Sequence, residues 1–415
     1  MLNFKCNSST LLKAVTIVEK SIPTRSSAQI LENLSLSLKG QVLTLWGYDM
    51  EIGIEYRLPI DNVTATGDVL VKAKTLVSIL AKLASQDVEI SVDDTYKMHI
   101  KGDHVEFEIL CLAPAEYPKL PPIETGQSLR LRSGDVCSLI QHTLFSVSTD
   151  ESRKFLNGIL MKVSGEDVVF VSTDGYRLSL KSQKIETALP ETAVIIPTKA
   201  VSEMLRIAQQ AEPDQMVEIA FSERQVAFFM PSFLLVSRVL EGKFPDYKQL
   251  MPTTFENEFT LARRPFLEAC ERAYIVSSFS HNVVRVVLTD NRATIQANAS
   301  SFGDFQEDLA ITKLKGVDEL KIAFNVKLVI DALKNTESDD VHLRINHGTS
   351  PCLIEPASGG DYTYVVMPIR TNDYQAPTAE AITPASAPEP QSETPSAQVE
   401  NTDSFAMNPA YADQH

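Results

Sequence analysis

The chain has 415 residues, of which 44% are hydrophobic, and its formal net charge is −16. That length suits two to four domains of roughly 100–200 residues each, and no apolar run reaches the roughly 18 residues that a membrane-spanning helix needs. Because a uniformly acidic surface repels phosphate, the charge argues against a general nucleic-acid binder unless basic residues gather on one face.

Helices at regular intervals are the first sign of an internal repeat. Leu11 to Ile22 carries apolar residues at helical spacing, and so do Val136 to Val147 and Phe266 to Tyr274. Pro265 suits the first position of the third of these helices. The three stretches begin about 125–130 residues apart, so each is expected to open one copy of the repeat.

Strands are expected between the helices of each repeat. Apolar and polar residues alternate there, which is typical of antiparallel strands with one buried face. Gly40 and Gly165 are expected to mark the turns. The clearest predicted pairs are Leu34–Leu38 with Val42–Leu45, and Gly158–Val163 with Val168–Val171.

A second helix follows a lysine in each repeat. Lys74, Lys199 and Lys327 lie 125 and 128 residues apart, and each stands between a short apolar strand and an amphipathic stretch. The fold class is therefore α+β, with three copies of one domain that packs two helices on an antiparallel sheet. The predicted domains are residues 1–125, 126–253 and 254–370.

The segment 371–415 has a different composition. It contains six prolines, seven acidic residues and no Lys or Arg, so residues 1–370 carry a net charge of −9. Without apolar periodicity it cannot bury enough surface to offset the entropy lost on ordering. We expect a disordered, acidic, Pro-rich tail.

Motifs for catalysis or metal binding are absent from the sequence. It has no phosphate-binding loop, no dinucleotide-binding glycine pattern, no H-E-x-x-H motif and no G-x-S-x-G elbow. The five cysteines are scattered without a C-x-x-C pair, which argues against disulfides and a zinc site. The first residues lack a signal-peptide pattern. We expect a cytoplasmic protein without a metal or a cofactor.

Asp174 and Arg177 leave one catalytic alternative open, a hydrolase or transferase that uses both in a cleft between repeats. However, Asp-Gly between two strands is first of all a turn signal. Asp49 holds the same place in the first repeat, whereas the third repeat has Asn298–Ser300 there, with no acid. These observations favour a structural turn.

Basic residues lie on or beside every predicted helix, although the chain is acidic overall. An ordinary solvated face would explain any one of them. A basic surface shared by repeated helices would bind phosphates without reading sequence, whereas an acidic scaffold that never contacts nucleic acid would show no such surface. The helical residues expected to supply a diffuse positive field are Lys74, Lys199, Arg206 and Arg264.

Five segments together resemble the beta subunit family of bacterial DNA polymerase III, the sliding clamps, over residues 1–370. They occur in order and at full domain spacing: Phe155–Gly158, Thr173–Leu178, Gly242–Tyr247, Phe324–Val326 and Tyr364–Arg370. The resemblance implies a non-enzymatic ring, formed by a head-to-tail homodimer of three-domain chains. Such a ring encircles duplex DNA without sequence specificity and acts as a processivity factor in DNA replication.

The resemblance also implies partners. These are double-stranded DNA, a second copy of the chain, an ATP-driven clamp loader complex, the catalytic subunit of DNA polymerase III, other DNA polymerases and repair proteins. The enzymes of the family's systems dock through short clamp-binding peptides, which carry a Gln near the start and Leu-Phe near the end. No membrane is implied.

Site residues follow from the family match, position by position. The positions that contact DNA are Arg25, Arg153 and Lys154. The positions of the dimer interface are Phe107, Ile109, Ile275 and Val276. The positions of the peptide-binding groove are Leu156, Thr173, Gly175, Tyr176, Arg177, Leu178, Pro245, Leu250, Asn325, Leu328, Val365, Val366, Met367, Pro368, Ile369 and Arg370.

Two features depart from the family pattern. The family's chains usually end at or near the position of Arg370, whereas this chain continues for 45 residues. Tyr176 stands where some relatives have His, and Leu328 stands where some have Tyr. The residues at positions 176 and 328 bear on which peptides the groove prefers.

Overall fold

The structure is a computed structural model that describes residues 2–120, 122–123 and 126–371. The described residues belong to one compact unit. Apart from Thr371, the predicted acidic tail lies outside the described residues. All five cysteines are free thiols, as the sequence predicts.

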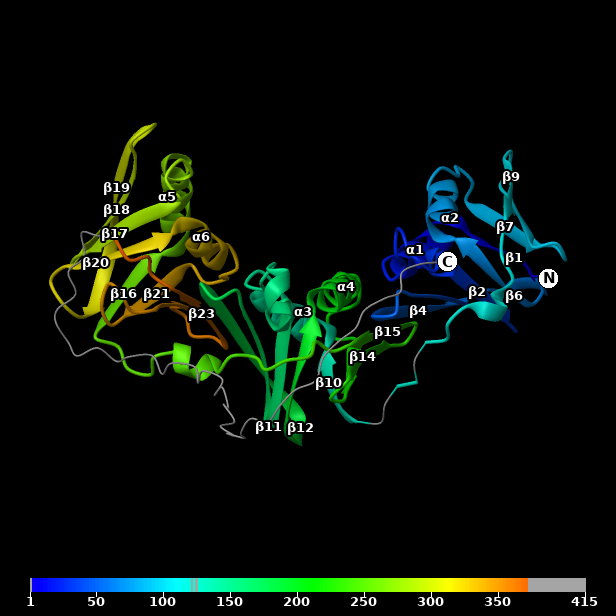
Figure 1. The fold of residues 1–415 in the computed structure, drawn as a ribbon, viewed down its shortest axis with the longest axis horizontal. Helices are drawn as coiled ribbons and strands as arrows, with labels where there is room; N and C mark the ends of the chain where they lie inside the picture. The colour runs from blue at the N-terminus through cyan, green and yellow to red at the C-terminus, as the bar shows by residue number, and fades with distance from the viewer. Residues whose placement is uncertain (1, 121, 124–125, 372–415) are drawn as a thin grey trace, which may run out of the picture. The chain divides into compact units, whose positions relative to one another are not determined.

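Each repeat has the same succession of a strand, a helix, several strands, a second helix and further strands (Figure 1). The first contains β1 (Leu2–Asn7), α1 (Ser8–Glu19), β2 (Asn33–Lys39), β3 (Val42–Tyr48), β4 (Ile52–Pro59), β5 (Asn62–Ala65), β6 (Gly67–Lys72), α2 (Ala73–Leu80), β7 (Asp87–Val92), β8 (Lys97–Lys101) and β9 (Glu106–Leu110). The second contains β10 (Gln127–Arg132), α3 (Ser133–Leu144), β11 (Gly158–Thr173), β12 (Arg177–Pro197), α4 (Thr198–Ala208), β13 (Met216–Phe221), β14 (Gln225–Met230) and β15 (Phe233–Arg238). The third contains β16 (Asn257–Ala262), α5 (Arg263–Ser277), β17 (Val283–Leu288), β18 (Arg292–Ala299), β19 (Gly303–Lys315), β20 (Leu320–Asn325), α6 (Val326–Lys334), β21 (Asp340–Ile345), β22 (Cys352–Pro356) and β23 (Tyr362–Val366).

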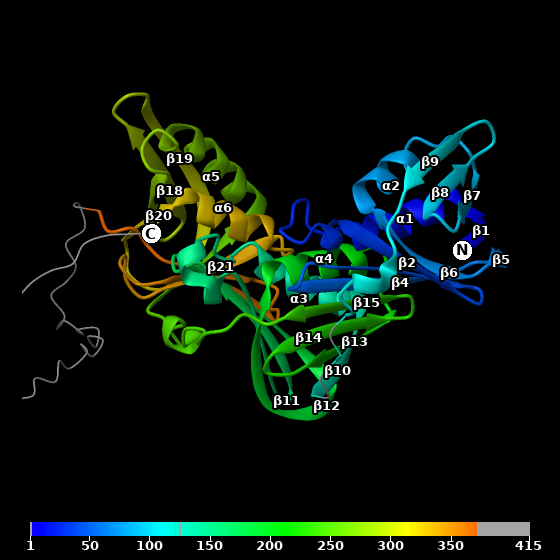
Figure 2. The same cartoon turned by 45° about the vertical axis from the view of Figure 1, so that its right-hand side comes forward.

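Both sets of predicted helices are confirmed. Lys74, Lys199 and Lys327 are each the second residue of their helix, α2, α4 and α6. The two helices of each repeat pack against each other, and Figures 1 and 2 show each pair side by side. One detail differs: α5 opens at Arg263, so Pro265 is its third residue, still within the first turn, where backbone N–H groups have no helical partner.

The predicted turn at Gly165 is wrong. β11 continues through Gly165 and pairs along its length with β12. Gly165 has a φ of +61° and lies between two register shifts of this pair. The extra residues at these shifts are in β12, so Gly165 lies opposite a β-bulge, which disturbs the pairing without ending either strand. The prediction for Gly40 is confirmed, since it joins β2 to β3 at a φ of +58°.

Sheets join each repeat to the next. An eight-stranded sheet runs β10-β13-β14-β15-β4-β3-β2-β6, and β15 of the second repeat pairs with β4 of the first. A ten-stranded sheet runs β11-β12-β23-β22-β21-β16-β19-β18-β17-β20, and β12 pairs with β23 of the third repeat. A five-stranded sheet, β5-β1-β7-β8-β9, completes the first repeat.

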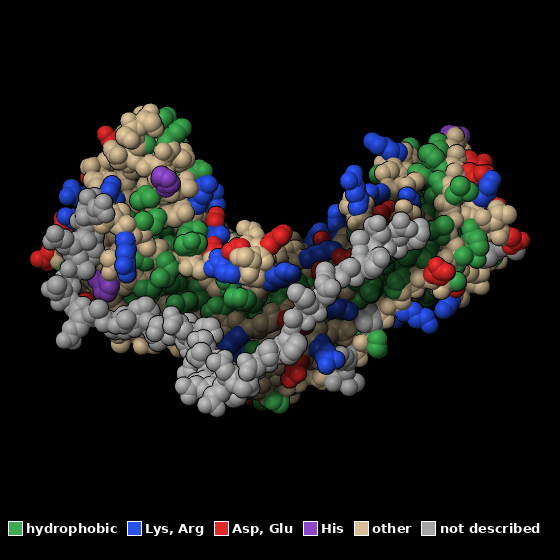
Figure 3. Space-filling model, in the orientation of Figure 1, with side chains coloured by type: hydrophobic (Ala, Val, Ile, Leu, Met, Phe, Trp, Pro, Cys, Tyr) green, Lys and Arg blue, Asp and Glu red, His purple; other side chains and the backbone are tan. Residues whose placement is uncertain are grey.

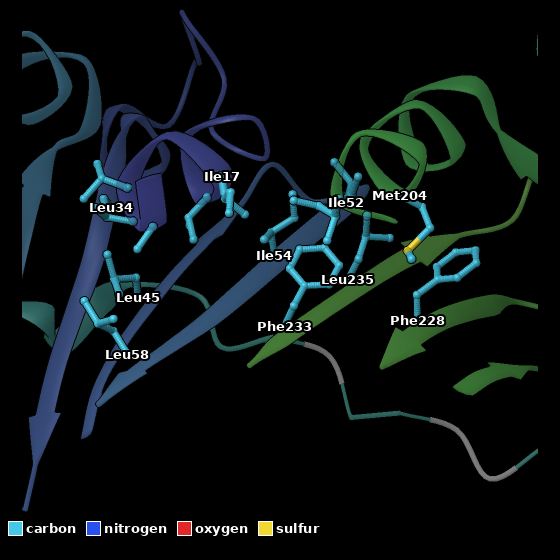
Figure 4. Packing of buried hydrophobic residues seen from close by; sticks show 14 of the residues in the cluster. Ile17, Leu34, Leu45, Ile52, Ile54, Leu58, Met204, Phe228, Phe233 and Leu235 are labelled. Carbon is cyan, nitrogen blue, oxygen red and sulfur yellow. The ribbon is translucent and has the colours of Figure 1, made fainter. Parts of the chain in front are cut away.

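The core continues across the joint between the first two repeats. Ile54 of β4 and Leu235 of β15 are register partners, and both side chains are fully buried. Figure 4 shows both beneath the helices in the middle of the cluster, with Leu34 of the first repeat toward one end and Met204 of α4 toward the other. Alternation along the strands thus places one apolar face beneath the helices of both repeats.

Leu235→Ala should therefore lower the free energy of unfolding by about 2–5 kcal/mol, the usual cost of removing a fully buried leucine side chain. The measurement is urea denaturation followed by circular dichroism. Leu314→Ala, at a leucine that is 55% exposed, is the matched control and should change stability by less than about 0.5 kcal/mol. Equal effects of the two substitutions would contradict a shared core at this joint.

Candidate functional site

The turn between β11 and β12 is built around Asp174. Its carboxylate accepts hydrogen bonds from the backbone N–H of Tyr176 (2.8 Å) and of Arg177 (3.0 Å), and from Nε of Arg177 (3.1 Å). Gly175 takes the left-handed backbone, with φ at +93°, that this turn requires. The carboxylate is thus occupied by structural bonds, which disfavours the catalytic alternative for Asp174 and Arg177.

Arg177 ties this turn to the third repeat. Its second contact runs to a carboxylate oxygen of Asp331 on α6, at 2.5 Å, and its guanidinium lies 5.4 Å from the ring centre of Phe145, which directly follows α3. The Arg177 side chain is only 13% exposed. A charge this buried is stabilised by its paired carboxylates, so Arg177 fixes the position of the turn against α6.

The chain after β23 runs beside the same turn. The N–H of Met367 donates to the carbonyl of Tyr176 (2.9 Å), and the N–H of Ile369 donates to the carbonyl of Ala323 (2.7 Å). Tyr176 is 67% exposed and Leu250 is 37% exposed, while Met367 is half-buried. A partly apolar surface thus forms where two repeats meet.

The residues of the predicted groove divide by depth. Those at least partly open to solvent are Gly175, Tyr176, Arg177, Pro245, Leu250, Asn325, Leu328, Met367, Pro368, Ile369 and Arg370. Those buried beneath them are Leu156, Thr173, Leu178 and Val365. Leu156, Leu178 and Val365 belong to one apolar cluster with Phe244 and Tyr247. They form a floor and do not present their side chains at the surface.

Val366 differs most from the predicted groove, because its side chain does not face that surface. It is 1% exposed and belongs to the core of the third repeat, whereas its neighbour Val365 belongs to the floor cluster. Successive side chains of a strand point to opposite faces, so only one of the two can face the groove. Asn325 also has a structural task, because its side chain accepts a hydrogen bond from the N–H of Lys327 at the start of α6 (3.2 Å).

A cavity of about 220 Å³ adjoins this surface and was not predicted. It lies over β17, β18 and β20 and is lined by Ile369, Ala323, Arg285 and Gln296, among others. Most outward side chains of these strands, such as Arg285, Gln296 and Lys321, are polar, and such alternation is typical of an ordinary solvated sheet face. The sequence offers no other signal for it.

His142 is buried where the second and third repeats meet. Its ring stacks on Tyr362 with centres 4.1 Å apart, and its Nδ1 lies 2.5 Å from the hydroxyl of Tyr364. Burial lowers the pKa of His142, so it is uncharged at neutral pH. We therefore assign it a packing role at this joint.

The predicted DNA-contact residues differ in how free their charges are. Arg25, Lys74 and Lys154 are exposed. Lys199 pairs with Asp49, Arg206 with Glu203 and Arg264 with Glu268. Figure 3 shows Lys and Arg side chains over α2 and over the α3–α4 pair, with acidic side chains among them. The positive field is therefore partly neutralised within the protein.

A second polar cavity, of about 440 Å³, lies where α1 ends and α2 begins. Lys20, Lys72 and Lys74 line it together with Glu19 and Glu32. Lys20 and Lys72 belong to the basic residues expected on or beside the predicted helices, but neither was matched to a family position that contacts DNA. Their signal in the sequence was weak, because a lysine near a helix end is usually an ordinary solvated residue.

Two of the predicted interface residues lie on β9 of the first repeat, and the other two lie on α5 of the third repeat. Phe107 and Ile109 are half-buried on β9, which is an edge strand of the five-stranded sheet. Ile275 is 58% exposed, but Val276 is 8% exposed and belongs to the core of its own repeat. The prediction for Val276 is therefore not supported, because neighbouring helix residues point in different directions.

Two exposed aromatic residues beside Ile275 were missed. Phe279 and Phe302 are 59% and 55% exposed, and their rings stack with centres 4.5 Å apart. Phe279 follows Ile275 by four residues, which places both on one side of the helix end. Exposed apolar groups that gather in this way indicate an interaction surface.

The described residues hold neither a metal-binding cluster nor a membrane-spanning helix. Within the described ranges, no group of three or more His, Cys, Asp or Glu side chains could hold a metal ion. No helix in the described part of the chain is long and apolar enough to cross a membrane.

Comparison with known proteins gives one consistent result. Residues 2–121, 130–246 and 248–370 match the N-terminal, central and C-terminal domains of the DNA polymerase III beta subunit. A beta sliding clamp of Halalkalibacterium halodurans is 30% identical over 382 residues, covering 89% of this chain and all of the relative. One of Staphylococcus aureus is 29% identical, covering 85% of this chain and 95% of the relative. The crystal structure of a sliding clamp from Pseudomonas aeruginosa bound to griselimycin is 27% identical and has a TM-score of 0.85, covering 89% of this chain and all of that one.

Proposed function

The chain belongs to the DNA polymerase III beta subunit family, and we propose which of its residues close the ring, contact DNA and bind partner peptides. The protein is a DNA sliding clamp, a processivity factor of DNA replication, and it is not an enzyme. The observation that carries this function is the match of all three clamp domains in order over residues 2–370. As part of the bacterial replication machinery, the clamp is expected in the cytoplasm.

We propose that the ring closes by strand addition between two copies. Among the described strands, β9 pairs on one side only, with β8. In β19, residues 303–310 pair with β18, whereas its pairing with β16 begins at Ile311. Two unpaired strand edges favour joining. Apolar residues at both ends would be covered, with Phe107 and Ile109 of one copy against Ile275, Phe279 and Phe302 of the next.

For DNA we propose contacts to phosphate only. Arg25, Arg153 and Lys154 contact the backbone, and Lys74, Lys199, Arg206 and Arg264 add a diffuse field, weakened for the last three by their carboxylate partners. Contacts of this kind depend steeply on salt and carry no sequence preference. Retention on DNA is then a matter of topology more than of affinity.

We propose that the clamp loader, the polymerases and repair proteins dock at the surface around Met367 and Tyr176. Half-buried Met367 is flexible and polarisable, which suits a site that must accept different apolar side chains. Exposed Arg370 can hold the polar groups of a peptide at the rim. The buried floor of Leu178 and Val365 gives the surface a fixed base.

Encirclement is tested by retention on DNA. A clamp placed by its loader on nicked circular DNA should stay bound at high salt and should leave when the circle is linearised, because the ends then release a ring. Gel filtration of the loaded DNA before and after cutting measures this. Equal loss from circular and linear DNA would rule out encirclement.

Ring closure is tested by Ile275→Asp. A carboxylate forced into an apolar interface without a partner costs several kcal/mol, so the variant should sediment with the mass of one chain where the wild type has that of two. Val317→Asp, at a residue that is 49% exposed on the same repeat, is the control and should remain a dimer. A dimer of the Ile275 variant would show that the contact lies elsewhere.

The groove is tested by Met367→Ala. Loss of its contacts should raise the Kd of a peptide with Gln near its start and Leu-Phe near its end by about ten-fold, which corresponds to about 1.4 kcal/mol. Fluorescence anisotropy measures the Kd, and sedimentation checks the ring. Met216→Ala, at a methionine that is 44% exposed on β13, should bind like the wild type. Unchanged affinity of the Met367 variant would place the peptide elsewhere.

A further inference from the structure

The side chain of Arg153 is shared between two acceptors. Its Nε donates to a carboxylate oxygen of Asp150 (3.1 Å), and its NH2 group donates to the backbone carbonyl of Asp174 (3.1 Å). Arg153 interrupts the short helix Glu151–Leu156 with a non-helical backbone, at φ −116° and ψ 61°. The side chain is 40% exposed, so its guanidinium braces a turn while still reaching solvent.

The guanidinium lies directly against the turn. A Cβ atom placed on Gly175 would lie 3.0 Å from NH1 of Arg153, so no side chain separates the two. The acceptor is the backbone carbonyl of Asp174. The side-chain carboxylate of the same residue accepts the N–H groups of Tyr176 and Arg177. Arg153 therefore restrains the outer side of a turn that Asp174 organises from within.

The restraint reaches the groove in one further step. The carbonyl of Tyr176 accepts the N–H of Met367 at 2.9 Å. Direct hydrogen bonds thus lead from Arg153 to the turn and from the turn to Met367. A shift of the turn would move both the exposed Tyr176 and the backbone that holds Met367.

We propose that Arg153 is a positioning residue that couples DNA in the ring to peptide in the groove. This rests on the proposed function, which assigns Arg153 to DNA and Met367 to the peptide. A phosphate binds guanidinium best through two parallel N–H groups, and the favoured pairs include the NH2 group. A phosphate that takes the Nε and NH2 pair displaces Asp150 and competes for the N–H that Asp174 accepts, so the turn loses its outer restraint.

The sign of the coupling follows from this competition. Peptide binds best when the turn is held, so DNA that captures Arg153 weakens peptide binding. By thermodynamic linkage, bound peptide weakens the phosphate contact by the same factor. One hydrogen bond of ordinary net strength sets the scale, because the Arg153 side chain is partly exposed to solvent, and we expect a factor of about five to ten.

The test measures peptide Kd by fluorescence anisotropy at low salt, with and without saturating blunt linear duplex, which can thread the ring. Wild type should bind peptide about five- to ten-fold more weakly with duplex present. Arg153→Ala should bind it weakly in both conditions, with no effect of duplex. Arg153→Lys keeps the charge but lacks the fork, and it should behave as Arg153→Ala does.

The matched control is Arg130→Ala. Arg130 also forms an exposed ion pair, with Glu218 at 3.0 Å, but lies outside both sites, so the control should keep the full duplex effect. A duplex effect that survives in Arg153→Ala, or that is missing in wild type, overturns the coupling while leaving the groove intact. Failure of wild type to bind the peptide at all overturns the groove and the coupling together.

Discussion

Backbone hydrogen bonding at sheet edges is the constraint on which this structure depends. An edge strand has N–H and C=O groups that need partners, and each repeat satisfies one edge by pairing with the next, β4 with β15 and β12 with β23. Backbone hydrogen bonds thus form the joints and continue the sheets from one repeat to the next. Unpaired edges at the outer ends of the described chain include β9 and the first half of β19. The same physics that joins repeats within a chain can then join two chains.

The two joints between repeats share a pattern of backbone hydrogen bonds, but the surfaces above them differ. At the first, the carboxylate of Asp49 accepts the N–H groups of Glu51 and Ile52, and Arg238 N–H donates to the carbonyl of Glu51. These bonds match those of Asp174 and Met367 at the second. Met50 even takes the left-handed backbone of Gly175, at φ +77°. However, the place of Leu178 is held by Gly53, where a Cβ would lie 2.1 Å from the side chain of Leu120. The first joint is closed by its own chain, so only the second offers an open surface.

Charge is distributed so that an acidic protein can enclose an acidic polymer. Most of the candidate DNA residues have a carboxylate close by, as Lys199 has Asp49 and Arg264 has Glu268. Such exposed pairs are worth little energy and exchange readily with other anions. They lower the strength of any one phosphate contact, which suits a ring that must slide. Residence on DNA then depends on closure of the ring and little on local affinity.

The threefold repeat could be predicted from the amino-acid sequence, together with the places of the helices and most of the strands, because periodicity of apolar residues is a local property. The sequence also identified Asp174 as a turn residue, since Asp-Gly between strands has few other uses. Which apolar side chains are buried, and in which cluster, depends on how the strands and helices pack. Val365 and Val366 are equally apolar neighbours, and β12 alongside β23 decides that one belongs to the floor and the other to the core. Val276 was lost to the core in the same way, while Phe279 and Phe302 became a surface pair because a helix end meets a hairpin. Arg153 was expected to hold only DNA, and its bond to Asp174 exists because two loops, 21 residues apart in sequence, meet in space. Contacts between distant segments depend on packing, which no local pattern encodes.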